Sequence, residues 1–371
     1  MEEPIFVTKP VLPPLENFYT HLEGIWERKI LTNCGPLHKE LEVKLCEYLD
    51  VEHISLFANG TLALLVALKA LKLSGNVITT PFSFVATSEV LSWNNLNPIF
   101  ADIDPETYNL SPKSIIDRIT PDTTAILPVH CYGNPCDVDA IAQIADDYNL
   151  KVIYDAAHAF GVKCHCGSVL NHGDLSILSF HATKVFNTFE GGAVICPDLK
   201  TKNRIDKLKN FGFVNQEKVT VNGLNAKMSE LNAAVGLCQL QHIEASISER
   251  KKIAKIYDRY FANNSKIIPP MFDNSLNYNY AYYPIRLIGS SKNHKSLRDY
   301  VFEKLKKKNI FSRKYFYPLI SDFQLYSRNK YHTPVASKVA EEVLCLPIYP
   351  ELERKNVIRI AKLVAQLVAE C

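Results

Sequence analysis

The alternation of short apolar runs with helix-like segments constrains the fold of this 371-residue chain most strongly. Between about residues 20 and 200, strand-like runs occur at 54–57, 77–80, 98–101, 125–130, 151–155, 176–180 and 193–196. Helical patterns separate many of these runs, at 61–73, 83–93, 112–119 and 138–148. Strands that alternate with helices predict βαβ units and a mostly parallel sheet that is covered on both faces. Such sheets bind ligands beyond the carboxyl ends of their strands.

The pattern changes after about residue 200. A long helical segment is expected at 228–260, followed by a loop rich in Asn and Pro at 263–279. Beyond the loop we expect further elements, namely a strand at 282–287, a helix at 295–308, an aromatic stretch at 311–317, and helices near 334–343 and 351–369. The sequence therefore predicts an α/β protein with two domains. The large domain covers 1–250 and includes a Pro-rich N-terminal arm, and the small one covers 251–371.

Composition and charge narrow the classes of partner. The chain has 42 Lys and Arg against 39 Asp and Glu, a net charge of +3, which gives no electrostatic reason to bind nucleic acid. The acidic N-terminus lacks the features of a signal peptide, and the longest apolar stretch, 62–68, is far too short to span a bilayer. We expect a cytoplasmic protein with no nucleic-acid partner and no membrane association.

The cysteines also favour a cytoplasmic protein. Ten are scattered through the chain without a C-x-x-C pair, so reduced thiols are expected rather than disulfides. The cluster Cys164-His165-Cys166 lacks the spacing of the common structural zinc sites, and we expect no metal. The sequence also lacks the P-loop, the Rossmann glycine fingerprint, H-E-x-x-H and G-x-S-x-G, which argues against the enzyme classes that these motifs mark.

Two motifs after predicted strands could hold a flat, anionic ligand. Asn59-Gly60-Thr61 follows the run 54–57 and begins an apolar helix, so its N–H groups and the Thr61 hydroxyl can cradle an anion. The alternative is an ordinary turn with Thr61 near the N-cap. Phe84 follows the run 77–80, where it could stack on a planar ligand or pack in the core.

Two ionisable residues also lie at or after the ends of predicted strands. Asp155 ends the run 151–155, and an aspartate buried there must be paired or functional, unless it caps the next segment. Lys184 follows the run 176–180 and precedes Val185 and Phe186. Apolar neighbours disfavour an ammonium ion, as a Schiff-base lysine requires, whereas the alternative is a solvated loop lysine.

Together the four sites match the needs of pyridoxal 5′-phosphate (PLP). Its phosphate needs an anion cradle and its ring an aromatic neighbour. Its pyridine nitrogen needs a carboxylate, and its aldehyde needs a lysine. The residues Thr61, Phe84, Asp155 and Lys184 supply these groups in chain order. We therefore expect PLP as the cofactor.

Five ordered runs carry a resemblance that covers nearly the whole chain: F-A-N-G-T-L-A-L, P-F-S-F-V-A-T, V-I-Y-D-A-A-H-A-F-G, S-F-H-A-T-K-V-F-N-T-F-E-G-G and G-L-N-A-K-M-S-E-L-N-A-A. They resemble the DegT/DnrJ/EryC1/StrS family of nucleotide-sugar aminotransferases. This resemblance implies the aspartate aminotransferase fold, known as fold type I. It also implies transfer of an amino group from L-glutamate to a keto sugar.

The resemblance assigns roles to individual residues. Lys184 is the lysine that binds PLP and shuttles a proton, Asp155 pairs with the pyridine nitrogen, His158 lies at the phenolic oxygen, and Phe84 stacks on the ring. The phosphate would be held by Gly60, Thr61 and Ser179.

A further position of the family motif implies a homodimer. Asn225 matches the asparagine that reaches the phosphate of the other subunit, so the active sites would be shared. The family often reads N-Y-R-M there, whereas this chain has Ala226 and Lys227. Lys227 is nevertheless one of three cations considered for the nucleotide diphosphate, together with Arg250 and Arg313.

The identity of the sugar follows from the resemblance alone. His181, three residues before Lys184, is the version found in the 4-aminotransferases of the family. It favours C4 of dTDP-4-dehydro-6-deoxy-D-glucose, with an aminated product used for surface polysaccharide. A 3-keto isomer and a GDP- or UDP-linked 4-ketone remain alternatives. So do a sugar dehydratase, which in this family carries His in place of the lysine, and a PLP-binding regulator without turnover.

Overall fold

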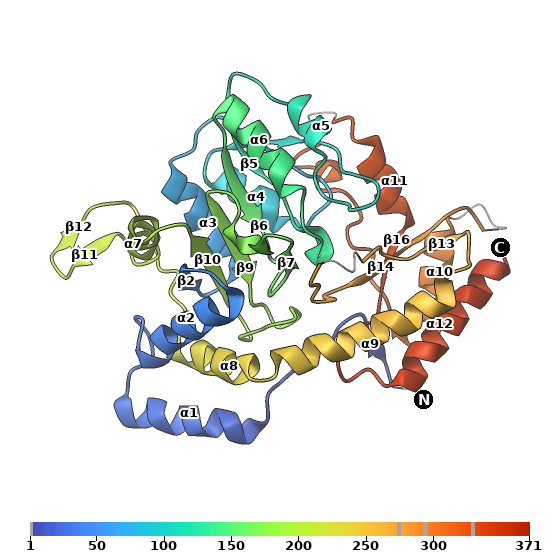
Figure 1. The fold of residues 1–371 in the computed structure, drawn as a ribbon, viewed down its shortest axis with the longest axis horizontal. Coiled ribbons are helices and arrows are strands. Elements are labelled where there is room, and N and C mark those ends of the chain that lie inside the picture. Colours follow the sequence, from blue (N-terminus) through green and yellow to red (C-terminus); the bar gives the residue numbers. More distant parts are fainter. Residues whose placement is uncertain (1–2, 273–275, 292–295, 328–330) are drawn as a thin grey trace.

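The computed structural model describes residues 3–272, 276–291, 296–327 and 331–371 (Figure 1). A seven-stranded sheet forms its centre. The strands lie in the order β2 (His53–Phe57), β10 (Gly192–Cys196), β9 (Leu175–Ser179), β6 (Lys151–Asp155), β5 (Thr123–Leu127), β3 (Asn76–Thr79) and β4 (Asn97–Phe100). Only β10 runs antiparallel to its neighbours in this sheet. The expected α/β fold with a mostly parallel sheet is confirmed.

Alternating side chains of each strand face two helical layers. On β6, Ile153 packs in one core cluster while Val152 and Tyr154 pack in another on the opposite face. The first face is covered by α3 (Gly60–Leu71), α4 (Ala86–Trp93) and α7 (Leu199–Leu208). The second face is covered by α2 (Pro36–Leu49), α5 (Pro112–Ile116), α6 (Val138–Tyr148) and α8 (Glu230–Leu240), with α1 (Leu15–Arg28) packed outside against α8.

The prediction of one long helical segment at 228–260 is wrong, because the structure has two helices there. The structure has α8, which ends at Leu240, and a separate α9 (Ile243–Phe261). His242 leaves helical geometry with φ −114° and ψ 0°. Neither Gly nor Pro marks this break, so the apolar pattern alone could not reveal it. After the break, α9 runs out of the large-sheet region and packs against α12 (Arg354–Ala369) (Figure 1).

The C-terminal region forms its own core around a three-stranded antiparallel sheet. Its strands are β13 (Ile267–Ile268), β14 (Tyr283–Leu287) and β16 (Val343–Leu346), and α9, α10 (Leu297–Lys306) and α12 pack on it, with α11 (Pro334–Glu342) beside it. The first residue of the helix expected at 295–308 and part of the loop expected at 263–279 lie outside the described residues. A domain boundary at 250 falls inside α9 and stays a prediction.

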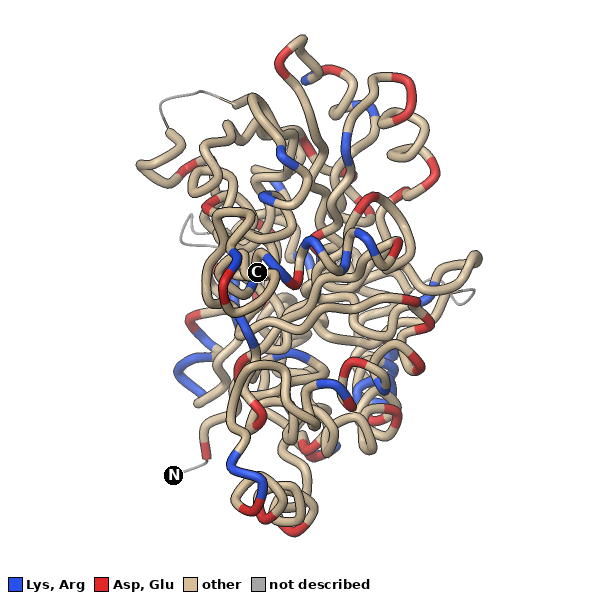
Figure 2. The backbone as a smooth tube through the Cα atoms, turned by 90° about the vertical axis from the view of Figure 1, so that its left-hand side faces the viewer, with Lys and Arg blue, Asp and Glu red and all other residues tan. Residues whose placement is uncertain are grey.

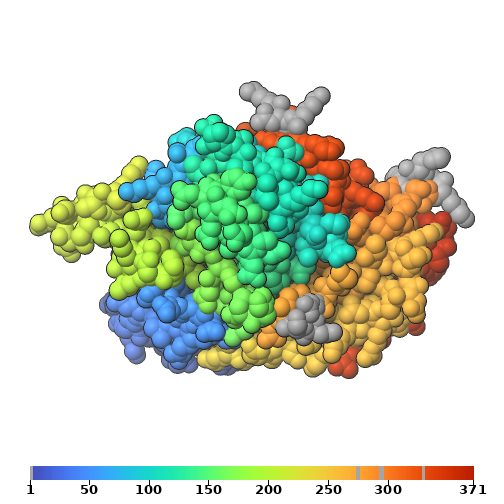
Figure 3. Space-filling view, turned by 45° about the horizontal axis from the view of Figure 1, so that its top comes forward, coloured from blue at the N-terminus to red at the C-terminus, as the bar shows by residue number. Residues whose placement is uncertain are grey.

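Short elements complete the chain. The N-terminal arm carries β1 (Ile5–Phe6), which pairs in parallel with β15 (Ile310–Phe311), so the arm packs on the C-terminal region. A hairpin of β11 (Phe213–Asn215) and β12 (Lys218–Val219) projects from the body (Figures 1 and 3). The remaining elements are β7 (Lys163–Cys164), β8 (Gly167–Ser168) and the 3₁₀ turns η1 (Cys131–Gly133), η2 (Val169–Asn171) and η3 (Ile320–Asp322).

Charged residues of both signs are interspersed along the tube of Figure 2, in keeping with the near-neutral composition. Among the described residues, no helix combines the length and the apolar character needed to cross a bilayer.

The Glu230 carboxylate joins two helices of the second face. It is fully buried at the start of α8, and its oxygens accept hydrogen bonds from the backbone N–H groups of Leu37 at 3.0 Å and His38 at 2.9 Å. These two groups belong to the first turn of α2, where N–H groups have no acceptor within the helix. A carboxylate at that end also interacts favourably with the helix dipole.

Glu230→Ala should lower the free energy of unfolding by about 2–4 kcal/mol, because two buried N–H groups lose their acceptor. Urea unfolding monitored by circular dichroism measures the change. Glu47→Ala is the matched control, since this glutamate on α2 is 60% exposed and pairs only with Lys44. The control should stay within about 0.5 kcal/mol of wild type. Equal losses in both variants would contradict the capping role.

Candidate active site

The start of α3 forms an anion cradle at the carboxyl ends of the strands. Asn59 is the N-cap, and its side chain accepts a hydrogen bond from the Leu62 N–H at 2.8 Å. Gly60 packs directly against the end of β9, because an added Cβ would lie 2.9 Å from the Cβ of Ser179. The helix start, the exposed Thr61 and the Ser179 hydroxyl therefore meet at one point. The structure brings the three expected phosphate ligands together.

Asp155 is buried at the end of β6, with both oxygens hydrogen-bonded. One oxygen accepts a hydrogen bond from the Thr87 hydroxyl at 2.8 Å and the other from the Ala157 N–H at 3.2 Å. Burial raises the pKa of this carboxyl, and the two hydrogen bonds and the Lys184 charge act in the opposite direction. A cationic partner placed against Asp155 would favour its ionised form.

Lys184 lies in the loop that follows β9, with its backbone N–H bonded to the carbonyl of His181 at 2.9 Å. Its Nζ lies 3.5 Å from the hydroxyl of Tyr282. Burial lowers the pKa of Lys184 from 10.5 to about 8, although the Asp155 charge raises it. A neutral amine is therefore accessible near neutral pH, which is the form that attacks a carbonyl.

His158 is held as a neutral imidazole beside these groups. Its Nδ1 accepts a hydrogen bond from the Tyr132 N–H at 3.2 Å, which assigns the proton to Nε2. Burial and the nearby Lys184 charge hold the pKa of His158 well below its usual value. The ring of Phe316 lies parallel to it with centroids 6.0 Å apart, and Tyr282 meets it edge-on.

Phe84 stands at the entrance to α4 and is 61% exposed. Its carbonyl accepts a hydrogen bond from the N–H of Thr87, the same residue that holds Asp155. An exposed aromatic ring one turn from the residue that binds the buried Asp155 carboxylate leaves room for a planar ligand. The position agrees with the expected stacking role, which stays a prediction.

Sequence reasoning missed three residues of this cluster. Thr87 lies three residues after Phe84 on an expected helix, a spacing that places both on one helix face. Tyr282 begins the expected strand 282–287 and was not considered for the site. Phe316 lies in the aromatic stretch 311–317, and its contact with His158 joins two segments that are far apart in the sequence.

The candidate substrate residues are dispersed. Arg313 is exposed and lines a cavity of about 420 Å³ together with Thr183, the residue before Lys184. His181 is bonded to the Thr183 hydroxyl at 2.8 Å and has Glu190 at 3.7 Å. Two larger cavities, of about 550 and 560 Å³, lie elsewhere, at the amino-terminal end of β9 and beside α7. We therefore regard the cavity of about 420 Å³ as the substrate candidate.

The prediction that Arg250 is a cation available to a diphosphate is wrong. It is 1% exposed, and its guanidinium donates hydrogen bonds to the backbone carbonyls of Ile348 at 3.0 Å and Ala281 at 3.4 Å. Its position inside α9 makes it part of the link between α9 and the small domain.

Asn225 and Lys227 lie together outside the cluster. The Lys227 ammonium donates hydrogen bonds to Asn225 at 2.7 Å and to Asn210 at 2.8 Å, and it lies over the ring of Phe211. Asn225 is exposed, so its side chain is accessible from outside this subunit.

Residues 15–365 match the DegT/DnrJ/EryC1/StrS aminotransferase family. The chain belongs to this family. The chain is similar to the dTDP-4-amino-4,6-dideoxy-D-glucose transaminase of Shigella dysenteriae, which is 53% identical over 95% of this chain and 96% of its own length. The enzyme of that name from Escherichia coli is 52% identical over 98% of both chains. The crystal structure of DesI in the presence of its TDP-sugar product superposes with a TM-score of 0.94 at 32% identity, covering 99% of this chain and 94% of that one.

Because the chain belongs to an aminotransferase family, the pKa of the Lys184 amine bears on its chemistry and can be tested directly. In cofactor-free protein, the rate of acetylation of Lys184 should rise with pH and be half-maximal near pH 8, because only the neutral amine reacts. Asp155→Asn should shift this midpoint to lower pH, since the variant removes the charge that stabilises the ammonium. Mass spectrometry of the tryptic peptides measures both, with exposed Lys200 as an internal reference. A midpoint near 10.5, or an upward shift in the variant, would contradict this electrostatic description.

Proposed function

We propose that this protein binds PLP and transfers an amino group from L-glutamate to C4 of dTDP-4-dehydro-6-deoxy-D-glucose. The product is dTDP-4-amino-4,6-dideoxy-D-glucose, a precursor for surface polysaccharide. The main support is the two relatives of 52 and 53% identity, named for making this sugar, which match the chain almost end to end. The convergence of Lys184, Asp155 and His158 supports the chemistry. Lys184 disfavours the dehydratase alternative, because those relatives carry His at this position.

The residues of the site fit PLP. The phosphate would take the cradle of Gly60, Thr61 and Ser179. The missing Cβ of Gly60 lets the helix start pack closely against Ser179, which places the Ser179 hydroxyl beside the N–H groups of the helix start, where anions bind. Bound PLP supplies an electron sink for proton transfer at the amino-bearing carbon, and carries the amino group between donor and acceptor. The Asp155 carboxylate keeps a proton on the ring nitrogen, and its two donors fix its orientation.

Lys184 transfers protons and His158 binds the phenolic oxygen of the cofactor. The neutral Nζ of Lys184 takes a proton from the amino-bearing carbon and returns it at the neighbouring position, as a general base and acid. The Nε2–H of His158 is free to donate to the phenolic oxygen of the cofactor, because its Nδ1 is occupied by the Tyr132 N–H. The Tyr282 hydroxyl positions the lysine amine at 3.5 Å.

The cavity beside Thr183 suits a sugar nucleotide. Its lining includes the cations Arg313 and Lys306, which can pair with a diphosphate, and the rings of Phe311 and Tyr315, which can pack on a sugar or base. Lys227 has its ammonium held by Asn210 and Asn225, so Arg313 is the stronger candidate for the diphosphate.

We also propose a homodimer with shared sites in the cytoplasm. The projecting β11–β12 hairpin and its flanks expose Phe211, Phe213 and Val219, and α1 exposes Tyr19 and Trp26. Exposed apolar side chains gathered on such elements are typical of protein interfaces. Exposed Asn225 could then reach the phosphate cradle of a second copy. All ten cysteines are unpaired, in keeping with a reducing compartment.

The substrate assignment is tested with a panel of ketones. With L-glutamate in excess, we expect the highest kcat/KM on dTDP-4-dehydro-6-deoxy-D-glucose, with NMR showing an amine at C4. The 3-keto isomer and the UDP- and GDP-linked 4-ketones should be slower. Lys184→Ala should lose several orders of magnitude in kcat, because it removes the proton shuttle. If another ketone is faster, the substrate is wrong while the aminotransferase assignment stands.

A shared site predicts complementation. Asn225→Asp places a negative charge at the partner's phosphate, and Lys184→Ala removes the amine of its own subunit. In a mixed dimer, one site carries both defects and the other carries neither. Mixing the two inactive proteins under conditions of subunit exchange should therefore restore activity, up to about one quarter of wild type for random exchange. Activity that never exceeds the sum of the parents, after exchange is proven by mass spectrometry, would rule out sharing through Asn225.

A further inference from the structure

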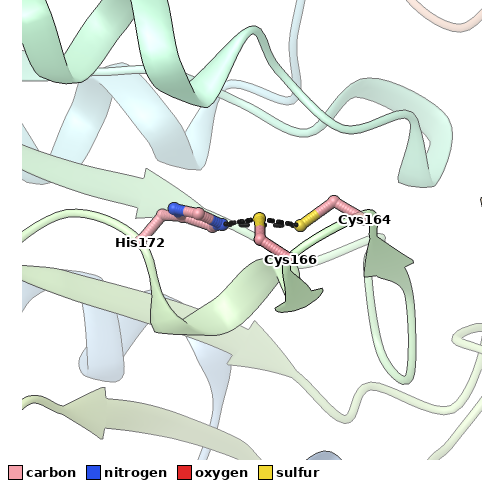
Figure 4. A group of neighbouring side chains, drawn as sticks. All are labelled: Cys164, Cys166 and His172. Atoms are coloured by element: carbon pink, nitrogen blue, oxygen red, sulfur yellow. Dashed lines mark hydrogen bonds between the residues drawn. The ribbon is translucent and has the colours of Figure 1, made fainter.

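Two thiols and an imidazole converge at a point that the aminotransferase reaction does not use. The Sγ atoms of Cys164 and Cys166 lie 2.8 Å apart, and the Nε2 of His172 lies 3.5 Å from the first and 3.3 Å from the second (Figure 4). All three ligand atoms lie within 4.8 Å of one another. Cys166 is exposed, so the point is reached from solvent.

The backbone holds this cluster in place. Cys164 and Gly167 face each other across the β7–β8 hairpin, and Gly167 takes a φ of +113°, which favours glycine. Cys166 lies in the two-residue loop between them. His172 follows η2, which is anchored because the Asn171 side chain donates a hydrogen bond to the carbonyl of Asp50 at 2.9 Å.

The spacing of the ligand atoms is close to that of a tetrahedral zinc site. Zn–S bonds of about 2.3 Å and Zn–N bonds of about 2.0 Å place sulfur and nitrogen roughly 3.5 Å apart, and two sulfurs roughly 3.8 Å apart. The two sulfur–nitrogen distances already match. The sulfurs would need to separate by about 1 Å, which a rotation of the exposed Cys166 side chain can supply.

We propose that Cys164, Cys166 and His172 bind one Zn²⁺ ion, with a water molecule in the fourth position. The two thiols lose their protons to solvent as the two thiolates bind the metal. Thiolate and imidazole ligands together suit zinc, whereas Mg²⁺ and Ca²⁺ prefer oxygen. The sequence argument against a metal considered only the C-x-C spacing, and His172 becomes part of the cluster only through the fold.

The position of the site indicates a structural role. His172 lies before the first residue of β9, whereas Ser179 and Lys184 lie at or beyond its last residue. The first and last residues of this five-residue strand lie about 13 Å apart. The ion would tie the β7–β8 hairpin to the turn before β9. This hairpin in turn pairs with the loop before β14, through Lys163 and Asn277.

The test uses the full-length, PLP-loaded protein purified without chelator. We expect about one zinc per chain by elemental mass spectrometry, and X-ray absorption showing two sulfur neighbours and one imidazole. Cys166→Ser and His172→Ala should each weaken zinc binding at least tenfold in competition with a chromophoric chelator. They should also abolish the rise in Tm that zinc gives to metal-free wild type. Aminotransfer at a temperature below unfolding should be unchanged.

Matched controls separate this site from the other thiols and imidazoles. Cys371→Ser and His21→Ala should retain wild-type zinc content. If either ligand variant is insoluble, zinc titration and X-ray absorption of metal-free wild type replace it. The proposal is overturned by reduced wild-type protein that takes up no zinc, by a metal shell without sulfur, by preferential uptake of copper, or by a Cys164–Cys166 disulfide in protein isolated under reducing conditions.

Discussion

The site depends on the interaction between the Asp155 carboxyl and the Lys184 amine, both of which are shielded from water. Burial disfavours the charged form of each group, and each partly restores the charge of the other. The net effect on Lys184 is a pKa lowered to about 8, so its neutral amine is accessible near neutral pH. The parallel strands β6 and β9 make this arrangement possible, because they end side by side and deliver Asp155 and the Lys184 loop to one edge of the sheet.

Much of this edge could be predicted from sequence, because the signals are local. Short apolar runs located all seven strands of the large sheet. The cofactor hypothesis rested on residues at or shortly after the ends of these runs, namely Thr61, Phe84, Asp155 and Lys184. Tyr282 could not be found in this way. It lies 98 positions from Lys184 and reaches it only when the small domain packs on the large one. His172 is similar, since the hairpin fold brings it to Cys164 and Cys166.

The charge of a residue also does not reveal whether its side chain will be buried in the fold or exposed to a ligand. Arg250 and Arg313 were both candidates for the diphosphate. Arg250 is buried and its guanidinium binds backbone carbonyls, whereas Arg313 is exposed beside a cavity. The break between α8 and α9 has a related cause. The two helices face different cores, and the change of direction at His242 is imposed by tertiary packing rather than by a helix-breaking residue.

The N-terminal arm links several distant segments through its backbone, while the side chains of Ile5 and Val7 pack in two core clusters. Ile5 pairs beside β15, the Val7 carbonyl accepts a hydrogen bond from the Ile348 N–H at 3.0 Å, and the Val11 carbonyl accepts one from the Asn187 side chain at 3.1 Å. Asn187 lies three residues after Lys184. Since the arm offers Val11 to the loop only as a carbonyl, side-chain changes there should be tolerated. Losing a single residue between Val7 and Val11 would shorten the arm and pull the Val11 carbonyl away from Asn187 in the Lys184 loop. The length of this segment is therefore constrained more than the side chains between these two residues.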